Sequence, residues 1–365
     1  MKRDLTETHT GALGRRVVAE AMPSPVELRG QLPGNACTVA SVAEGRRMLT
    51  EILDRNDPRW VVIVGPCSIH DPVAALDYAQ RLRQLAEDVS DTLVLVMRAY
   101  FEKPRTTIGW KGLINDPHLD GSCRMGEGMY LARDTLLQLG GLGLPVATEA
   151  LDLFSMAYLG DLVSWAAIGA RTTESQPHRE MSSGLPMPVG FKNGTDGNVE
   201  VAIHAMGAAA RSHTYLGMDE DGRMAILRSS GNPFGHLILR GGGRPNYDAV
   251  SIRHAEQTMI RHQVPANIVV DCAHGNSNKQ PQRQPLVMMD VVSQIEQGNR
   301  SIVGVMIESF LEAGSQAIQP DRDRMKYGCS VTDACIDWHT TEQLVRQAHR
   351  RLRPLLAQRF LHTAA

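Results

Sequence analysis

The sequence predicts an α/β protein built on a closed (β/α)8 TIM barrel, and two observations lead to this fold class. Eight short runs rich in Val, Ile and Leu recur along the chain, and segments with helical periodicity lie between several of them. Continuous apolar runs are typical of strands that are buried on both faces of a parallel sheet. Their alternation with helices over roughly 300 residues favours a barrel over an open, doubly wound sheet.

The expected strands contain only short apolar stretches, such as WVVIV and LVLVM. They are 60–66, 93–99, 144–150, 163–169, 187–193, 236–242, 267–272 and 302–308. No GxGxxG or GxxxxGK[ST] turn follows the first strand. Because such turns cradle phosphates in the open nucleotide-binding sheets, their absence here also favours the barrel.

Three helices of the barrel have readable sequence signals. Asp71 followed by Pro72 predicts a helix start after the first strand, with Asp71 as the N-cap. Apolar residues at helical spacing predict further helices over 126–140 and 285–297. Gly298 follows the last of these, as expected for a helix C-terminus.

We expect residues 1–58 to form an N-terminal extension outside the barrel. A capping box, with Ser24 at the N-cap and Glu27 three residues later, predicts a short helix there. A second helix is expected to be capped by Thr38 and to run to about Asp54. Since this segment precedes the first strand, we interpret it as an oligomerisation or regulatory arm.

Residues 59–365 are expected to form the catalytic barrel, with one insertion between the fifth and sixth strands. The insertion, 213–230, holds two strand-like runs on either side of an Asp-Gly pair. Asp-Gly between apolar runs is a strong signal for a tight β-turn. The sequence therefore predicts an inserted β-hairpin.

Composition excludes several classes of protein. The 365 residues include 38 Lys and Arg against 40 Asp and Glu, so no global basic excess is available to hold a nucleic-acid backbone. No apolar run approaches the ~20 residues that span a bilayer, and the N-terminus has no secretory signal. Six dispersed cysteines are expected to be reduced thiols. We expect a cytoplasmic protein with no nucleic-acid or membrane partner.

Polar side chains follow nearly every expected strand. Chemistry in this kind of barrel is built at the carboxyl ends of the strands. Each residue there could be an ordinary cap, a surface charge or an ion-pair partner, but five of the residues are cations that would converge on one rim: Arg98, Lys103, Arg171, Lys192 and Arg240. Because like charges repel, the convergence favours a site for a multiply charged small anion.

A second set of residues offers one sulfur, one imidazole and two carboxylates. It comprises Cys67, His274, Glu308 and Asp333. This mixture suits a divalent transition metal better than Mg²⁺ or Ca²⁺. Since no local spacing motif links the four residues, their types alone leave a metal site and ordinary packing equally open.

Long motifs resemble the microbial, class I type of 3-deoxy-D-arabino-heptulosonate 7-phosphate (DAHP) synthase. They are GPCSIHDP (65–72), VMRAYFEKPRTTIGWKGLINDP (96–117), GARTTESQPHRE (169–180), PVGFKNGTDGN (188–198), ILRGG (238–242), DCAHGNSNK (271–279) and SVTDAC (330–335). The likeness extends from about Arg59 to Trp338. It implies a metal-dependent barrel enzyme that condenses phosphoenolpyruvate with erythrose 4-phosphate, the entry step of the shikimate pathway to aromatic amino acids.

The resemblance also implies roles for individual residues. Cys67, His274, Glu308 and Asp333 would bind one divalent transition metal ion, such as Mn, Fe, Co or Zn. Phosphoenolpyruvate would be bound by Arg98, Lys103, Arg171, Lys192 and Arg240. Gly169 and Ala170 would also bind substrate. Arg105 and Thr106 would hold the phosphate of erythrose 4-phosphate.

Three residues are candidates for proton transfer. We expect Lys103 to protonate the new alkoxide, with a pKa lowered by the neighbouring cations. Glu149 and Lys192 are candidates for handling the attacking water.

The resemblance is closest to the tyrosine-sensitive branch, which implies an aromatic amino acid effector and a homodimer or homotetramer. Two departures from the family pattern, Leu153-Phe154-Ser155-Met156 and Pro186, fall in loops that shape the inhibitor pocket of the family. Because proline fixes φ and removes a donor, we expect altered or absent feedback inhibition.

Three other functions stay open from the sequence. Lys192 could form a Schiff base in a metal-free aldolase. The chain could be a non-catalytic paralogue that binds phosphorylated metabolites, although every metal and anion position is present. Condensation of phosphoenolpyruvate with arabinose 5-phosphate would use the same anion site, but the KPRTT run disfavours it.

Overall fold

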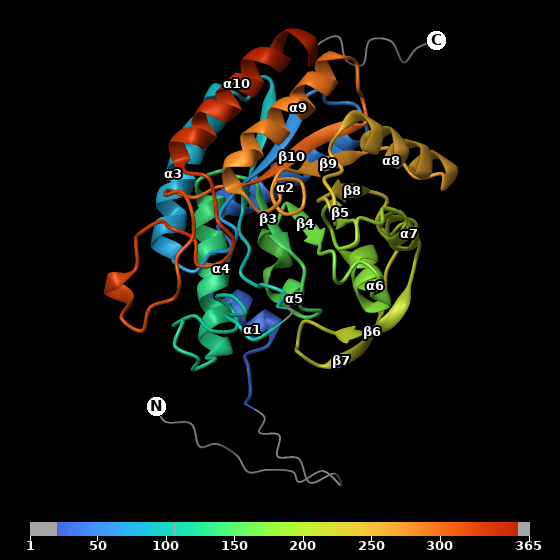
Figure 1. Ribbon diagram of the computed structural model, residues 1–365. Helices are drawn as coiled ribbons and strands as arrows, with labels where there is room; N and C mark the ends of the chain where they lie inside the picture. The colour runs from blue at the N-terminus through green and yellow to red at the C-terminus, as the bar shows by residue number, and fades with distance from the viewer. Residues whose placement is uncertain (1–19, 106, 357–365) are drawn as a thin grey trace.

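Eight parallel strands close into a barrel in the computed structural model, which describes residues 20–105 and 107–356 (Figure 1). The strands are β1 (Trp60–Gly65), β2 (Leu93–Arg98), β3 (Val146–Glu149), β4 (Trp165–Ile168), β5 (Val189–Lys192), β8 (Gly235–Leu239), β9 (Ile268–Asp271) and β10 (Ile302–Glu308). They pair in chain order, and β10 closes the ring on β1, with Gly65 opposite Glu308. The predicted fold class is confirmed.

Helices surround the strands (Figure 1). They are α3 (Pro72–Asp88), α4 (Met125–Gly141), α5 (Ser155–Leu159), α6 (Gln176–Gly184), α7 (Glu200–Ala209), α8 (Ala249–Arg261), α9 (Gln284–Glu296) and α10 (Trp338–Leu356). The three helices predicted from sequence correspond to α3, α4 and α9. The Asp71 side chain caps α3 by accepting from the N–H groups of Val73 and Ala74, and Gly298 follows α9 with a φ of 98°.

The barrel interior is a packed core and not a pore. Ile63, Val96 and Ile238 belong to one inner cluster of buried side chains. A larger cluster lies between the strands and the surrounding helices. Because each strand is buried on both faces, its sequence is continuously apolar, which is the pattern that predicted it.

In the described part of the extension, the first helix is α1 (Pro25–Gln31), whose predicted capping box is present. The second helix, α2 (Ala36–Leu53), starts earlier than expected, so the prediction of Thr38 as its N-cap is wrong. The cap is Asn35, and its Oδ1 accepts from the Thr38 backbone N–H at 2.8 Å. A capping side chain binds the N–H about three residues ahead, so Thr38 is the partner of the cap, already inside the first turn.

Helix α2 seals the amino end of the barrel. Its side chains Leu49, Ile52 and Leu53 belong to the inner cluster of the barrel. The Asn267 side chain, just before β9, donates to the Leu53 carbonyl at 2.9 Å. The carboxyl end is therefore the open end of the interior, where polar groups can reach a ligand.

The insertion folds as the predicted hairpin. Strands β6 (Thr214–Met218) and β7 (Met224–Arg228) are antiparallel and form a separate two-stranded sheet. One face of this sheet carries exposed apolar side chains, namely Leu216, Met224 and Ile226. Within the described ranges, no helix combines the length and the apolar composition that a membrane crossing needs.

Candidate active site

The last residues of four strands place buried charges at the carboxyl end of the barrel. They are Arg98, Lys192, Asp271 and Glu308, which are 0, 4, 0 and 2% exposed. Arg98 Nη2 lies 3.2 Å from Glu308 Oε1, and Lys192 Nζ lies 3.4 Å from Asp271 Oδ2. Buried charges are costly unless they are paired. Arg98 and Lys192 are two of the five predicted cations, and protein carboxylates neutralise their charges. These two cations therefore do not depend on a bound anion alone.

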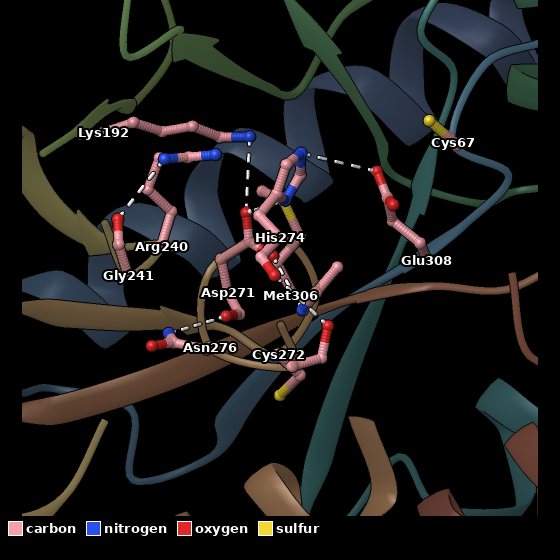
Figure 2. Close-up of polar contacts among 12 residues, drawn as sticks. Cys67, Lys192, Arg240, Gly241, Asp271, Cys272, His274, Asn276, Met306 and Glu308 are labelled. Carbon is pink, nitrogen blue, oxygen red and sulfur yellow. Dashed lines mark hydrogen bonds and ion pairs between the residues drawn. The ribbon is translucent and has the colours of Figure 1, made fainter. Parts of the chain in front are cut away.

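Three of the four predicted metal ligands form one group. Ligand atoms of Cys67, Glu308 and Asp333 all lie within 4.8 Å of one another, with Asp333 at the exposed edge. His274 lies beside this group, with its Nε2 3.9 Å from Glu308 Oε1 (Figure 2). A thiol, an imidazole and two carboxylates gathered in this way are a donor set that fits a divalent transition metal.

The His274 ring lies against a carboxylate that the sequence interpretation did not assign to the site. Asp271 Oδ2 lies 2.9 Å from His274 Nδ1, which leaves Nε2 directed toward Glu308. Although burial opposes ionisation, His274, Lys192 and Arg98 hold the pKa of Asp271 well below its usual range. The sequence contains a signal that could have identified Asp271, because this acidic residue ends a strand three positions before the candidate ligand His274. Carboxylates commonly orient metal-binding histidines.

Lys103 lies against the metal group. Its Nζ is 3.1 Å from Cys67 Sγ and 3.2 Å from the Cys67 carbonyl oxygen. Burial acts to lower the pKa of Lys103, but the nearby Cys67, Glu308 and Glu149 outweigh it and raise the pKa. The expected lowering of the pKa is wrong, because the negative charges of the site affect Lys103 more strongly than the Arg98 cation does.

For the Cys67 thiol, burial and a neighbouring charge change the pKa in the same direction. Burial, followed by the charge of Glu308, raises the pKa of Cys67, while Lys103 opposes the change. Asp333 keeps a lowered pKa even though burial opposes it, because Lys103 and His274 favour its charged form.

Glu149 ends β3 with one free oxygen. The residue is 6% exposed, and its Oε1 has no hydrogen-bond partner among the described residues. A side chain at position 169 would displace this oxygen of the Glu149 carboxylate. Ala170 and Arg171 follow directly, and within the described chain the exposed Arg171 has no hydrogen bond or ion pair.

The remaining predicted residues lie on neighbouring loops. Arg240 follows β8 and donates from Nη1 to the Gly241 carbonyl at 3.3 Å. Figure 2 shows the side chains of Lys192 and Arg240 both pointing toward His274. Arg105 is exposed, and its Nε donates to the Trp110 carbonyl at 2.7 Å. Thr106 lies outside the described residues.

Comparisons with known proteins agree with the resemblance in the sequence. A family model described as the DAHP synthetase I family matches residues 37–346. A tyrosine-sensitive phospho-2-dehydro-3-deoxyheptonate aldolase of Salmonella typhimurium is 54% identical over 340 residues, which cover 93% of this chain and 96% of that protein. A tryptophan-sensitive form from Escherichia coli is 49% identical over 328 residues, or 90% of this chain and 94% of that protein.

The same relationship holds for the fold. A solved phospho-2-dehydro-3-deoxyheptonate aldolase of Francisella tularensis superposes with a TM-score of 0.89 at 41% identity. The superposition covers 92% of this chain and 98% of that one. The matched family model and relatives span the barrel and every described residue of the candidate site, so the chain belongs to the DAHP synthetase I family.

Proposed function

We propose that the chain is a metal-dependent DAHP synthase. It condenses phosphoenolpyruvate with erythrose 4-phosphate and water, and it releases DAHP and inorganic phosphate as the first step of the shikimate pathway. The observation that carries the proposal is the group of Cys67, Glu308 and Asp333 beside buried cations at the open end of the barrel. The related aldolases named above support the same activity.

Cys67, His274, Glu308 and Asp333 would hold the divalent ion, with Mn, Fe, Co and Zn as candidates. A bound ion of this kind supplies Lewis acidity, which polarises an aldehyde oxygen. Asp271 would fix the orientation of His274 through its contact with Nδ1.

The cations would bind phosphoenolpyruvate, which carries both a phosphate and a carboxylate. The set is Arg98, Lys103, Arg171, Lys192 and Arg240, together with the chain at Gly169 and Ala170. Arg171 supports this role because it is exposed at the rim and unpaired within the described chain. Guanidinium groups suit these anions because their planar forks can donate two parallel hydrogen bonds. Arg105 and Thr106 would bind the phosphate of erythrose 4-phosphate.

Carbon three of the enol phosphate attacks the aldehyde carbon, water adds at carbon two, and phosphate leaves by cleavage of its C–O bond. Lys103 donates a proton to the new alkoxide, and its raised pKa keeps it protonated for that step. The free Oε1 of Glu149 accepts a proton from the attacking water. Lys192 is the second candidate for orienting that water.

The Schiff-base alternative finds less support. A lysine that forms an imine must be a neutral amine, whereas the Lys192 ammonium is paired with the buried Asp271. Borohydride treatment in the presence of phosphoenolpyruvate and the aldehyde should therefore leave no covalent adduct on Lys192.

An apolar cavity is the proposed effector site. It has a volume of about 520 Å³ and lies between α5, α6 and the hairpin. Its lining includes Phe154, Met156, Met181 and Pro186. Because the related enzymes are called tyrosine-sensitive and tryptophan-sensitive, an aromatic amino acid is the proposed ligand. With Pro186 and the 153–156 segment in the lining, we expect weak or absent inhibition by tyrosine.

We also propose a homodimer or homotetramer. The exposed apolar face of the hairpin, defined by Leu216, Met224 and Ile226, supports this assembly. Exposed apolar patches often mark protein–protein contacts, because a second subunit can bury their apolar surface. The extension, residues 1–58, is the second proposed contact. Light scattering during size-exclusion chromatography tests this point, and a monomer at micromolar concentration would contradict it.

A phosphate-release assay tests the proposed activity. Phosphoenolpyruvate plus erythrose 4-phosphate should release phosphate, EDTA should abolish the release, and Mn²⁺ should restore it. The same assay with tyrosine, phenylalanine and tryptophan tests the effector. Release with arabinose 5-phosphate in place of erythrose 4-phosphate, or release that EDTA does not change, would refute the proposal.

A further inference from the structure

We propose that three asparagine side chains, Asn193, Asn246 and Asn276, form one network that positions Lys192, Arg240 and His274 relative to one another. The three amides link the loops that follow β5, β8 and β9. They are positioning residues, because they act through the side chains that would contact substrate and metal. The proposal rests on the proposed function above, since it assigns phosphoenolpyruvate to Lys192 and Arg240.

Asn193 connects the ends of β5 and β8. It follows Lys192 directly and is 0% exposed. Its Oδ1 accepts from the Arg240 backbone N–H at 2.8 Å. Its Nδ2 donates to the carbonyls of Gly194 at 2.8 Å and Gly241 at 3.1 Å. The backbones that carry Lys192 and Arg240 are thus joined through one side chain.

Asn276 connects the ends of β8 and β9. It is 3% exposed, and its Nδ2 donates to the Leu239 carbonyl at 3.0 Å. The same Nδ2 donates to the Asp271 carbonyl at 2.8 Å (Figure 2). Leu239 ends β8 and Asp271 ends β9. The loop that holds His274 is therefore tied to the last residues of both strands.

Asn246 joins these two links into one network. Its Oδ1 accepts from the Gly241 N–H at 2.7 Å, and its Nδ2 donates to Asn193 Oδ1 at 3.2 Å. Its own backbone N–H donates to Asn276 Oδ1 at 2.8 Å. Every amide in the network uses both its donor and its acceptor, which neither Asp nor Leu could do.

The local backbone explains why side chains have to make these bonds. Gly241 has a φ of 72°, so the chain turns out of the strand and the regular sheet pairing ends. The Gly275 N–H still donates to the Arg240 carbonyl at 3.0 Å, and a Cβ on Gly275 would lie 2.8 Å from the Gly241 carbonyl carbon. The two loops are in direct backbone contact, and the amides satisfy the polar groups that the strands leave unpaired.

The functional consequence concerns the substrate and not only stability. A displacement of about 1 Å at a binding group can cost about 10²-fold in rate. Removing one amide frees the loops of β5, β8 and β9 to move separately. We expect the KM for phosphoenolpyruvate to rise, while the KM for erythrose 4-phosphate, assigned to the β2 loop, stays nearly unchanged.

The test compares Asn246→Ala with a matched control, Asn232→Ala. Asn246 is half-buried and Asn232 is buried. The Asn232 Nδ2 donates to the carbonyls of Ser182, Leu185 and Met187, but the residue precedes β8 at the amino end of the barrel. Both variants should lower the melting temperature. Only Asn246→Ala should raise the KM for phosphoenolpyruvate, by about tenfold, and weaken its binding by calorimetry to the same degree.

Two further variants sharpen the result. Asn246→Asp keeps the acceptor for the Gly241 N–H but loses the donor to Asn193, so its KM should be intermediate. The double variant Asn193→Ala/Asn246→Ala should bind phosphoenolpyruvate about as weakly as the worse single variant, because the two residues form one network. The proposal is overturned if the losses of phosphoenolpyruvate affinity in the two single variants multiply in the double variant. It is also overturned if Asn232→Ala raises the KM for phosphoenolpyruvate as much as Asn246→Ala does.

Direct binding separates this inference from the proposed function. A wild-type protein that binds phosphoenolpyruvate but releases no phosphate with erythrose 4-phosphate refutes the activity alone. In that case, the dissociation constant for phosphoenolpyruvate still tests whether the asparagine network positions the binding residues. A dissociation constant that does not change in Asn246→Ala overturns the network even if the wild type is fully active.

Discussion

The two ends of the barrel use polar residues in opposite ways. At the carboxyl end, the last residues of five strands are buried and ionisable: Arg98, Glu149, Lys192, Asp271 and Glu308. At the amino end, α2 covers the interior with apolar side chains, and the buried polar contacts there include one between two aromatic rings. Trp165 Nε1 donates to His236 Nε2 at 2.9 Å.

The difference shows how one fold can serve stability and chemistry separately. Burying apolar surface is favourable, whereas each buried ion costs several kcal/mol before its partner offsets that loss. The covered amino end therefore contributes stability, and the carboxyl end holds charges in places that stability alone would not favour. Changes at the amino end should alter unfolding, and changes at the carboxyl end should alter substrate or metal binding.

The largest expected effect is the loss of Lys103 at the carboxyl end. Lys103→Met removes the proposed acid, and acid catalysis contributes roughly 10² to 10⁴-fold. We expect kcat to fall by that factor, as measured by phosphate release. The melting temperature should change little, and turnover within about tenfold of wild type would show that Lys103 is not the acid.

At the amino end, Leu49→Ala should reduce stability without affecting the site. Leu49 is 2% exposed in the inner cluster, and truncating such a leucine costs about 2–5 kcal/mol. Val39→Ala on the same helix is the matched control, since Val39 is 59% exposed. Urea unfolding measures the free energy of unfolding of both variants. A higher KM for phosphoenolpyruvate in Leu49→Ala would contradict the separation of the two ends.

His236 makes the amino end sensitive to acid. Burial lowers the pKa of His236 to about 4 from 6.5. Below pH 6.5 the unfolded chain takes up a proton that the folded protein excludes, so stability falls between pH 6.5 and pH 4. The pKa shift corresponds to about 3 kcal/mol. His236→Phe should flatten the dependence of the unfolding free energy on pH over this range, and a slope equal to that of wild type would disprove the role.

The smallest expected effect is on metal affinity. Asp271→Asn keeps the shape of the side chain but removes the charge beside His274 Nδ1. Loss of such a supporting carboxylate typically costs 10–100-fold in affinity. Calorimetry with Mn²⁺ should show this loss. Asp248→Asn, which alters the cap of α8 away from the site, should leave Mn²⁺ binding unchanged.

Local sequence patterns predicted most of the fold. Each barrel strand lies within a few residues of its predicted run, because a strand buried on both faces is apolar along most of its length, up to the polar residue at its carboxyl end. The error at Thr38 has a local cause. Asn35 and Thr38 are both good caps, and only the backbone conformation shows which of them begins the helix.

The residue types of the site could be predicted from the sequence, but the contacts between those residues could not. Cations and ligands were expected at the strand ends, yet the sequence could not show that Arg98 pairs with Glu308, 210 positions away. The pKa of Lys103 was predicted in the wrong direction for the same reason. Counting the cations in the chain does not show that Cys67 Sγ lies 3.1 Å from the Lys103 ammonium.

The sequence alone determined where the barrel strands lie, where the helices with clear sequence signals lie, and which charged residues stand at the carboxyl ends of the strands. Those properties depend on neighbours within a few positions, so periodicity and capping residues encode them. Only the tertiary structure decided that Asp271 holds both His274 and Lys192, and that three asparagines join the surrounding loops. Pairing of this kind depends on distance and burial in space, which closing the barrel creates between residues far apart in the chain.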